Sequence, residues 1–335
     1  MVLKAGDELR HTSILNEDYY WRESLYFNFN DSTNRIGGWL YLWVVPNQPE
    51  PSGMLVSLYH GQWPDFTIND KAMSSDGHRI VEGDRWIYCF KRDVDYLIDE
   101  DFDDVSLCGM TFRRVEPLRR QHLKFEDPEG NGFDLEAEFL MPPYDYADGA
   151  HKTPYWMATN RYHRSWHAKG VLTIAGHRYQ VDCTGDSDHS WGQRHNIEFA
   201  KNLFKMWSFQ SREHGLSVSV LKQGVSEEDE QIPLGYVTRD GRVAAATRIE
   251  TNASYDQDGV QSSIVLEVED ELGRVVKAQM SSMHAFVGSG SLETLWGYEG
   301  VGDYIVDGIG KVQGLCSYFW PARVTPARLS SGEWA

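Results

Sequence analysis

The sequence predicts an all-β protein built from antiparallel strands. Polar and apolar residues alternate with a period of two in many segments, as in 24–31 and 84–92, and successive side chains of a strand point to opposite faces of a sheet. Turn signals such as Asp240-Gly241 separate neighbouring strand-like segments, which favours hairpins. Helical periodicity is scarce. Together these observations predict a β-barrel or a β-sandwich.

Strand-like segments follow one another along the whole chain. In order, the predicted strands and hairpins are 24–31, 37–45, 84–92, 134–142, 170–183 with a turn at Ala175-Gly176, 215–223, 233–250, 262–282 with a turn at Leu272-Gly273, and 308–320. The best helix candidates are short, at 93–104 and 196–205. The acidic cluster of 93–104 is equally typical of a solvated loop.

The chain divides into two halves with a similar pattern. Each half begins with an aromatic-rich segment, "YFNF" in the first and "MWSFQ" in the second, and continues through hairpins. A chain of 335 residues is long enough for two domains. We therefore predict two β-barrel-like domains, covering residues 1–197 and 198–335.

Composition and charge exclude several classes of partner. The net charge of −18 argues against nucleic acid and against anionic membrane surfaces, which both require a basic protein surface. No run approaches the roughly 20 apolar residues of a membrane helix, and the segment "MVLKAGDELRHTS" lacks the apolar region of a signal peptide. The four cysteines are widely spaced, unlike a zinc or disulfide framework. We expect a cytoplasmic protein without metal or cofactor.

The segment most suggestive of a functional site is 185–192, "GDSDHSWG". If it is extended, Asp186 and Asp188 share one face of the strand, and His189 and Trp191 share the other. Two neighbouring carboxylates repel each other, which raises the pKa of at least one of them. A carboxyl that stays neutral near pH 7 can donate a proton. Because Asp and Ser beside glycine are also typical of turns, a polar turn is the alternative.

A second polar and aromatic cluster, "YWMATNRYHRSWH", precedes that segment. Trp156, Tyr162 and Trp166 in it are candidates for a pocket wall, together with His163. A metal site formed by His163 and His167 is disfavoured, because residues four apart on a strand lie roughly 13 Å from each other. The same pair would meet only on a helix.

The run "GHRYQVDCTGDSDHSWGQRHN" resembles the D-H/R-x-W-G signature of the carotenoid 1,2-hydratase-like and AttH-like proteins. "YFNFND" with "GGWLYLWVVPN" resembles the opening strands of the first barrel of that family. "KMWSFQSREHGLSVSV" and "GDYIVDGIGKVQGLCSYFW" resemble the opening and closing strands of the second barrel. The resemblance covers most of the chain and implies two tandem lipocalin-like barrels.

The resemblance also implies a set of site residues. In the hydratases of this family an acidic residue of the motif is proposed to protonate an isolated alkene, and water captures the carbocation. It therefore implies Asp188 as the general acid/base. Asp186 stands where those hydratases carry an aromatic residue, so either it tunes Asp188 or the chemistry differs. His163 and Trp166 lie at about the place where the hydratases use a His and a Trp. From the residues themselves we expect His163 and His189 to form a proton relay, and we expect a substrate-binding wall made of Tyr162, Trp156, Trp166 and Trp191.

These observations lead to one main functional expectation. We expect a cofactor-independent hydratase or dehydratase, a lyase, acting on a hydrophobic substrate of isoprenoid or polycyclic type in a cavity near the junction of the two barrels. The alternatives are an isomerase or pericyclase on such a substrate, and a carrier that binds an apolar ligand without changing it. The sequence leaves open whether the protein is a homodimer.

Overall fold

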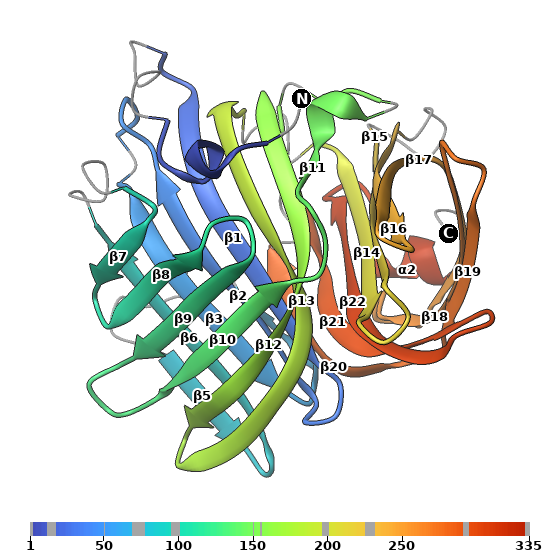
Figure 1. Ribbon diagram of the computed structural model, residues 1–335. Coiled ribbons are helices and arrows are strands. Elements are labelled where there is room, and N and C mark those ends of the chain that lie inside the picture. The colour runs from blue at the N-terminus through green and yellow to red at the C-terminus, as the bar shows by residue number, and fades with distance from the viewer. Residues whose placement is uncertain are drawn as a thin grey trace.

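The structure is a computed structural model that describes residues 3–11, 18–49, 51–68, 78–94, 101–149, 151–154, 156–195, 201–224, 232–290 and 295–331. Most of these residues are in strands, which form two large sheets (Figure 1). The predicted all-β class with two lipocalin-like units and few short helices is confirmed.

The first sheet curls into a half-barrel, at the left of Figure 1. Its strands run in the order β5 (His78–Glu82), β6 (Arg85–Asp93), β3 (Gly53–His60), β2 (Ile36–Val44), β1 (Trp21–Asp31), β13 (His177–Gln193), β12 (Asn160–Ile174), β10 (Gly132–Phe139), β9 (Arg120–Glu126), β8 (Met110–Glu116) and β7 (Asp104–Leu107). The two-residue β11 (Tyr144–Asp145) pairs with β12 off this path. The end strands β5 and β7 do not pair with each other in the described part of the chain, so this sheet stays open.

The second sheet closes into a barrel of eight strands, at the right of Figure 1. The barrel strands are β14 (Leu203–Ser211), β15 (Leu216–Gly224), β16 (Ile232–Arg239), β17 (Arg242–Tyr255), β18 (Gln261–Asp270), β19 (Val275–Met280), β21 (Leu295–Val306) and β22 (Gly310–Pro321). Pairing between β19 and β21 closes the ring. The short helical elements of the described chain are η1 (Ala5–Glu8), η4 (Tyr146–Asp148) and α2 (Pro326–Ser330).

The predicted hairpin turns are confirmed, and one helix candidate is wrong where it can be checked. Ala175 and Asp240 adopt positive φ angles of 55° and 54°, each followed by a glycine that also has positive φ, as tight hairpin turns require. The segment 203–205 lies in β14, so tertiary pairing overrides its helical pattern, whereas 196–200 lies outside the described residues. Most of the other helix candidate, 95–100, also lies outside them.

Each sheet buries its inner face in a core of its own. Phe27 and Trp166 belong to the core of the first sheet, and Trp207 and Phe209 belong to the core of the barrel. The outer faces of the two sheets pack against each other through two further apolar clusters. Trp39 belongs to one of these clusters, which joins β2, β3 and β6 to β20 and β21. The alternation within each strand thus produces two inner faces and one shared junction.

One strand of the N-terminal half is part of the second sheet. Strand β4 (Gln62–Ile68) pairs in parallel with β20 (Met283–Gly290), which extends the barrel sheet beyond β21. The backbone N–H of Phe286 also donates to the carbonyl of Gly61, at 3.1 Å. Apart from β4, the strands of the two sheets separate between Gln193 and Leu203. We propose a domain boundary near residue 197, with β4 as a tie across it.

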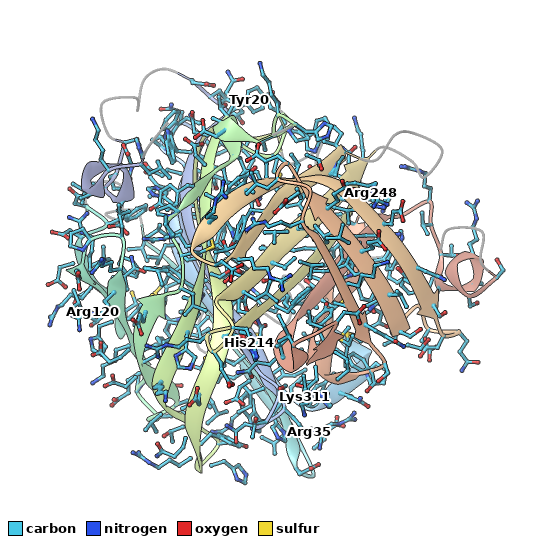
Figure 2. The ribbon with its side chains drawn as sticks, turned by 45° about the vertical axis from the view of Figure 1, so that its right-hand side comes forward. Tyr20, Arg35, Arg120, His214, Arg248 and Lys311 are labelled. Carbon is cyan, nitrogen blue, oxygen red and sulfur yellow. The ribbon has the colours of Figure 1, made fainter. Side chains whose placement is uncertain are left out.

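Charged side chains lie on the outer surfaces of both sheets. Figure 2 shows Arg120 at the edge of the first sheet and Arg248 on the barrel, and both are solvent-exposed. Three of the four cysteines are buried and Cys108 is exposed, and all four are free thiols. The helices within the described residues are all too short or too polar to cross a membrane.

Candidate active site

The segment 185–192 is a strand interior and not a polar turn. It lies within β13, between β1 and β12. In an antiparallel pair, residues directly opposite each other share a face, and Asp188 is opposite both Tyr26 and His163. The predicted alternation therefore holds, because Asp188 faces the junction between the sheets while His189 faces the core of the first sheet.

The first glycine of the segment is required by close packing. A β-carbon on Gly185 would lie 2.0 Å from the carbonyl oxygen of Asn28 and 2.8 Å from the indole of Trp166. Contacts that short do not occur in folded proteins without displacement of the backbone. Gly185 thus lets Trp166 lie flat against β13, inside the core of the first sheet.

A cavity of about 480 Å³ lies between the outer faces of the two sheets. Small-molecule sites are commonly of this size and have mostly apolar walls with a few polar groups. The walls come from β1, β2, β12 and β13 on one side and from β14, β21 and β22 on the other. The charged side chains that line it are Arg22, Arg161, Asp188, Arg194 and Glu299. Its apolar and aromatic lining consists of Tyr26, Trp39, Tyr41, Met157, Ala158, Phe204, Met206, Leu315 and Phe319.

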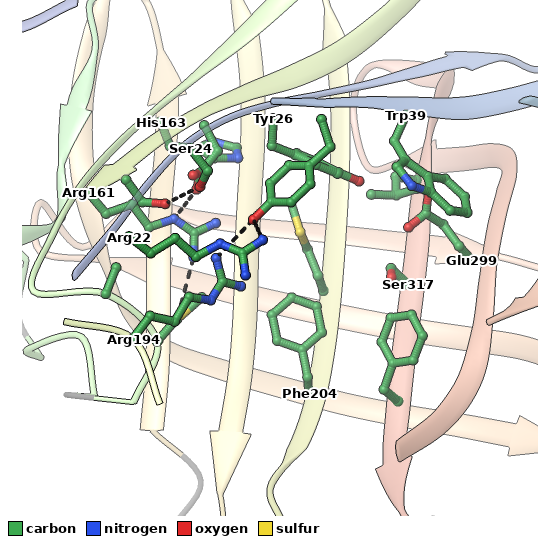
Figure 3. Close-up of a pocket in the computed structure, with 18 residues that line it drawn as sticks. Arg22, Ser24, Tyr26, Trp39, Arg161, His163, Arg194, Phe204, Glu299 and Ser317 are labelled. Atoms are coloured by element: carbon green, nitrogen blue, oxygen red, sulfur yellow. Dashed lines mark hydrogen bonds and ion pairs between the residues drawn. The ribbon is translucent and has the colours of Figure 1, made fainter. Parts of the chain in front are cut away.

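The charged groups of the cavity are separated in space (Figure 3). Arg22, Arg161 and Arg194 gather on one side, which we call the arginine end. Glu299 lies on the opposite side with Trp39, and we call this the carboxyl end. Aromatic side chains lie between the two ends, so a ligand that spans the cavity contacts cations at one end and a buried carboxyl at the other.

Asp188 belongs to the arginine end, where it forms an ion pair with Arg161. Both side chains are about nine-tenths buried, with 8% and 10% of their surfaces exposed. Burial alone would lower the pKa of Arg161, but the charge of Asp188 raises it above the usual value. Asp188 therefore serves as the counter-ion that makes a buried guanidinium tolerable.

Glu299 is the most perturbed carboxyl that lines the cavity. It lies on β21 directly opposite Ser317 of β22, and Met206 is the next residue in the same row, on β14. Burial raises the pKa of Glu299 to about 8, although a hydrogen bond with Ser317 opposes the shift. One carboxyl oxygen, Oε1, has no hydrogen-bond partner among the described residues. Glu299 is thus a neutral acid at pH 7 with a free oxygen.

Asp186 is buried behind the cavity wall and is not part of its lining. Burial raises its pKa to about 7, against hydrogen bonds from neighbouring side chains that lower it. Ser165 Oγ donates to Asp186 Oδ1 at 3.0 Å, and Nε2 of Gln210 on the barrel strand β14 donates to the same oxygen at 3.0 Å. Asp186 therefore links the two sheets through a polar contact inside the junction.

Asp186 is connected to His163, which does line the cavity, by a chain of hydroxyl groups. The Tyr236 hydroxyl lies 2.9 Å from Ser165 Oγ, and His163 Nδ1 lies 3.0 Å from the same Tyr236 oxygen. Because Ser165 gives its only proton to ionised Asp186, it accepts from Tyr236, which in turn accepts from the Nδ1–H of His163. Nε2 of His163 is left as an acceptor, with no partner in the described part of the chain.

Burial and two nearby cations keep the imidazole of His163 neutral. Desolvation lowers the pKa of His163 well below its usual range, and Arg161 and Arg164 lower it further. A neutral imidazole can take a proton on Nε2 while it passes the Nδ1 proton to Tyr236. We refer to His163, Tyr236, Ser165 and Asp186 as the relay.

The other predicted site residues lie away from this cavity. Tyr162, Trp166, His189 and Trp191 face the inner side of the first sheet, where His189 Nε2 bonds to Glu23 Oε1 at 2.9 Å. Trp156 packs into the apolar cluster of the junction beside Met157 and also does not line the cavity. The residues that we expected to form one site therefore lie on two faces of the first sheet, because adjacent residues of a strand point to opposite faces.

His189 and Trp191 hold the N-terminal segment against the first sheet. His11 stacks on Trp191 with ring centroids 3.8 Å apart, and His11 Nδ1 lies 2.9 Å from the same Glu23 oxygen that His189 contacts. Arg10 Nε donates to the other oxygen of Glu23, at 2.9 Å. Burial would raise the pKa of Glu23, but the two histidines and Arg10 hold it well below its usual range.

His11, Glu23 and His189 are also the one group in the described residues whose ligand atoms are close enough for a metal ion, all within 4.8 Å of one another. The guanidinium of Arg10 on the same carboxylate repels a cation. Hydrogen bonds and the Arg10 ion pair already satisfy Glu23, so the arrangement is best explained as a structural network. His163 and His167 form no such group there.

Replacement of this buried carboxylate is expected to destabilise the fold. We expect Glu23→Gln to reduce the free energy of unfolding at pH 7 by about 3 kcal/mol, because Arg10 loses its buried counter-charge. The pKa of Glu23 is lowered in the folded state. The difference in the free energy of unfolding between wild type and the variant therefore shrinks as the pH falls below the pKa of an ordinary glutamate. Urea unfolding measures the free energy of unfolding of both proteins. The control is Glu116→Gln, which removes the charge from an exposed ion pair. Equal stability of the two variants would contradict a structural role for Glu23.

Sequence reasoning missed Glu299 and the three arginines of the cavity. Glu299 stands in "LWGYEGVG", where a single acidic residue interrupts an apolar and glycine-rich strand. Arg22 similarly interrupts "YYWRESLYF". A charged residue inside a strand of large apolar residues is a usable signal, since such residues are rarely buried without a purpose. Arg22 and Glu299 lie far apart in the sequence, and the packing of the two sheets brings them to one cavity.

Comparisons with known proteins agree with the fold. A candidate AttH from Nitrosomonas europaea superposes with a TM-score of 0.54 and 12% identity, covering 91% of this chain and 93% of that chain. At this identity the likeness shows the fold alone. Kievitone hydratase from Nectria haematococca superposes with a TM-score of 0.49 and 10% identity, covering 88% of this chain and 87% of that chain. CghA superposes with a TM-score of 0.47 and 9% identity, covering 90% of this chain and 87% of that chain.

Sequence comparison gives a family without an assigned activity. A search of curated proteins found no match. The model of the family described as a domain of unknown function, DUF7064, matches residues 4–313. Since that match covers nearly the whole chain, the protein belongs to the DUF7064 family.

Proposed function

We propose that the cavity is the active site of a hydratase or dehydratase that acts on an apolar substrate by general acid–base catalysis. The observation that carries the proposal is that an acid and a base line one cavity, with His163 on the side of Arg161 and Glu299 on the side of Trp39 (Figure 3). Glu299 supplies a carboxyl whose pKa burial raises to about 8, and His163 supplies an imidazole nitrogen without a partner. An acid and a base that line one cavity are what addition or removal of water requires.

Glu299 is the proposed proton donor. A carboxyl with a pKa near 8 is protonated at neutral pH, which makes it an acid by the same principle that keeps buried carboxyls neutral in other active sites. It is a weak acid, so it suits a leaving hydroxyl or an activated double bond better than an isolated alkene. We therefore assign proton donation to Glu299, and leave Asp188 as the counter-ion of Arg161.

His163 is the proposed base. When Nε2 accepts a proton, the positive charge that forms on the ring lies next to Arg161 and Arg164, which disfavour it. The relay removes this difficulty, because Nδ1 can release its proton toward Tyr236, Ser165 and finally ionised Asp186. The pKa of Asp186, raised by burial to about 7, matches such a proton acceptor.

The proposed reaction balances in both directions. In hydration, Glu299 gives its proton to a carbon of the double bond, and His163 takes a proton from the water whose oxygen bonds to the other carbon. In dehydration of a substrate that binds with its hydroxyl beside Glu299, protonated Glu299 gives its proton to the departing hydroxyl, which leaves as water, and His163 takes the proton from the neighbouring carbon. Aromatic rings of the lining, among them Trp39 and Phe204, stabilise positive charge that develops on the substrate.

The test is an isotope experiment on the whole protein. The protein is incubated with a panel of apolar alkenes and alcohols, of isoprenoid and polycyclic type, in water enriched in ¹⁸O. We expect at least one alkene to gain one labelled water, or one alcohol to lose its hydroxyl, by mass spectrometry. Tight binding with unchanged ligand would indicate a carrier, and a rearranged product without label would indicate an isomerase or pericyclase. Either outcome would contradict the hydratase proposal.

A further inference from the structure

The carboxyl end of the cavity holds a polar atom that no described residue uses. Glu299 lines the cavity and is buried. Burial raises its pKa to about 8, which keeps the carboxyl protonated at neutral pH. Ser317 already bonds to this carboxyl, but Oε1 of Glu299 has no hydrogen-bond partner among the described residues. Because a buried polar atom without a partner costs stability, this arrangement is best explained by a ligand that bonds to it.

The ligand group that fits a protonated carboxyl is a hydrogen-bond acceptor. A protonated carboxyl presents an O–H donor, and a carboxylic acid that burial keeps neutral can donate it to a ligand oxygen. Trp39 and Met206 line the cavity around Glu299, and apolar surroundings strengthen such a bond. A carbonyl oxygen gains most from this donor when negative charge develops on it during a reaction.

The strength of this acid limits what it can protonate. An isolated carbon–carbon double bond is so weak a base that it takes a proton only from a strong acid. A carboxyl with a pKa of about 8 is a weak acid. The oxygen of an enolate, by contrast, is more basic than the carboxylate of Glu299 and accepts the proton readily. Protonated Glu299 therefore suits a double bond that is conjugated to a carbonyl group.

The placement of the proposed acid and base also favours a conjugated substrate. His163 lies on the side of Arg161, and Glu299 lies on the side of Trp39 (Figure 3). Tyr26 lies between them. Addition of water to an isolated double bond requires the acid and the base at adjacent carbons. Conjugate addition requires the acid at the carbonyl oxygen and the base at a water beside the β-carbon, and a chain of conjugated bonds separates these two places. Groups on different sides of the cavity meet this second requirement.

We propose that the substrate of this site is an apolar α,β-unsaturated ketone, with its carbonyl oxygen at Oε1 of Glu299 and its β-carbon on the side of His163. The corresponding β-hydroxy ketone is the substrate of the reverse reaction. Aromatic lining residues, among them Tyr26, Trp39 and Phe204, offer flat faces to a planar conjugated group. As a substrate class it rests on the function proposed above, whereas the contact between the carbonyl and Glu299 requires no turnover.

Conjugate addition at this site balances in protons and electrons. The water oxygen bonds to the β-carbon while His163 takes a proton from the water. The electron pair of the double bond moves toward the carbonyl, whose oxygen takes the proton of Glu299, and an enol results. Ionised Glu299 then takes this proton back from the enol, as the α-carbon accepts the proton that His163 holds. In this class of substrate Glu299 thus gives its proton to oxygen and not directly to carbon, and both residues return to their starting state.

Binding by the whole protein gives the first test. Benzalacetone, an aromatic α,β-unsaturated ketone, and trans-β-methylstyrene, which lacks the carbonyl group, are titrated separately into wild type at pH 7. The quenching of tryptophan fluorescence is the readout. We expect benzalacetone to bind at least tenfold more tightly than trans-β-methylstyrene, because its oxygen takes the hydrogen bond of Glu299. Equal or weaker binding of benzalacetone would overturn the proposal.

The carbonyl of the bound ligand gives a second and more local test. Benzalacetone with ¹³C at the carbonyl carbon is bound to each protein, and infrared difference spectra report the C=O stretching frequency. A hydrogen bond to the oxygen weakens the C=O bond and lowers this frequency. We expect a lower frequency in wild type than in Glu299→Leu, which has no donor, and an intermediate frequency in Glu299→Gln. Identical frequencies in wild type and Glu299→Leu would show that the carbonyl does not contact Glu299, against the proposal.

Wild type alone provides the same test through pH, so the proposal does not depend on the folding of a variant at Glu299. Above about pH 8 this carboxyl releases its proton and can no longer donate. As the pH rises from 7 to 10, we expect the C=O frequency to rise and the preference for benzalacetone over trans-β-methylstyrene to fall at least tenfold. Glu250→Gln, at an exposed carboxylate of the barrel, is the matched control and should behave as wild type. A frequency and a preference that stay constant over this range would contradict the proposal.

The rate of water addition tests the catalytic part. Allylbenzene carries an isolated double bond beside the same aromatic ring. We expect wild type at pH 7 to convert benzalacetone into its β-hydroxy ketone at least tenfold faster than it adds water to allylbenzene, as measured by mass spectrometry. An equal or higher rate on allylbenzene would overturn conjugate addition as the reaction of this site.

The outcomes separate the substrate class from the proposed function. If an isolated alkene gains labelled water while the bound carbonyl shows no contact with Glu299, the α,β-unsaturated ketone is the wrong substrate and the hydratase proposal stands. If the C=O frequency reports that contact while no compound of the panel gains or loses water, the binding mode stands and the hydratase proposal is wrong.

Discussion

Replacing Glu299 with glutamine is expected to abolish most of the hydration or dehydration activity. Glutamine has nearly the same size and retains hydrogen bonding to Ser317, but it cannot give up a proton. Loss of a general acid typically costs a factor of about 10² to 10⁴ in rate. We expect kcat to fall by this factor with little change in KM, measured on the substrate identified in labelled water. A matched control is Glu250→Gln, whose carboxylate lies on the exposed surface of the barrel.

The pH dependence of wild type gives a second readout of the same residue. Activity that depends on protonated Glu299 declines as the pH rises through about 8, the value to which burial raises its pKa. The residual activity of Glu299→Gln should lack this decline. A flat profile for wild type between about pH 5 and 9 would contradict general acid catalysis and favour an isomerase or pericyclase.

Glu299 also makes the stability of the fold depend on pH. Its pKa is about 8 in the folded protein against a usual value of 4.5, so the folded state binds a proton that the unfolded state has released. Stability therefore decreases as the pH rises from about 4.5 through about 8. The contribution of this one group is on the order of 5 kcal/mol. In Glu299→Gln this part of the decline is absent, as urea unfolding at a series of pH values would measure.

Replacing His163 with asparagine is expected to have a comparable effect on the rate. Asparagine can still donate a hydrogen bond to Tyr236, but it offers no basic nitrogen in the cavity. We expect kcat to fall by about 10² to 10⁴ with an intact fold, as reported by circular dichroism and thermal unfolding. His167→Asn, at a partly exposed histidine on the same strand that bonds to Asp182, is the matched control.

Tyr236→Phe separates the base from the relay. This change removes the hydroxyl that connects His163 to Ser165 and Asp186 and leaves the imidazole in place. If the relay carries protons, the rate falls and its dependence on the ionisation of Asp186, near pH 7, is lost. A purely structural role for Tyr236 would reduce stability without altering the shape of the pH profile.

The fold could be predicted well because its signal is local. Period-two alternation and hairpin dipeptides identify strands and turns within a few residues, and Asp240-Gly241 forms the hairpin that its sequence predicts. The failed helix at 203–205 shows the limit of local reasoning. There the pairing of β14 with β15 and β22 outweighs the helical pattern of the segment.

The candidate site could be predicted only in part because it is assembled across strands. Alternation alone separates the face of Asp186 and Asp188 from the face of His189 and Trp191. It does not reveal that Asp188 faces Arg161, nor that Glu299 from the barrel faces the same cavity. Those relations depend on the register of β12 with β13 and on the way the outer faces of two sheets pack, which no short segment encodes.

The central claim is that Glu299 is a neutral acid in the cavity at physiological pH, and vibrational spectroscopy tests it most directly. Infrared difference spectra of wild type against Glu299→Gln are recorded as the pH is raised from 6 to 10. The account predicts a protonated carboxyl C=O band at pH 7 that is missing in the variant and that converts to carboxylate bands near pH 8. A carboxylate signal from Glu299 already present at pH 6 would contradict the account.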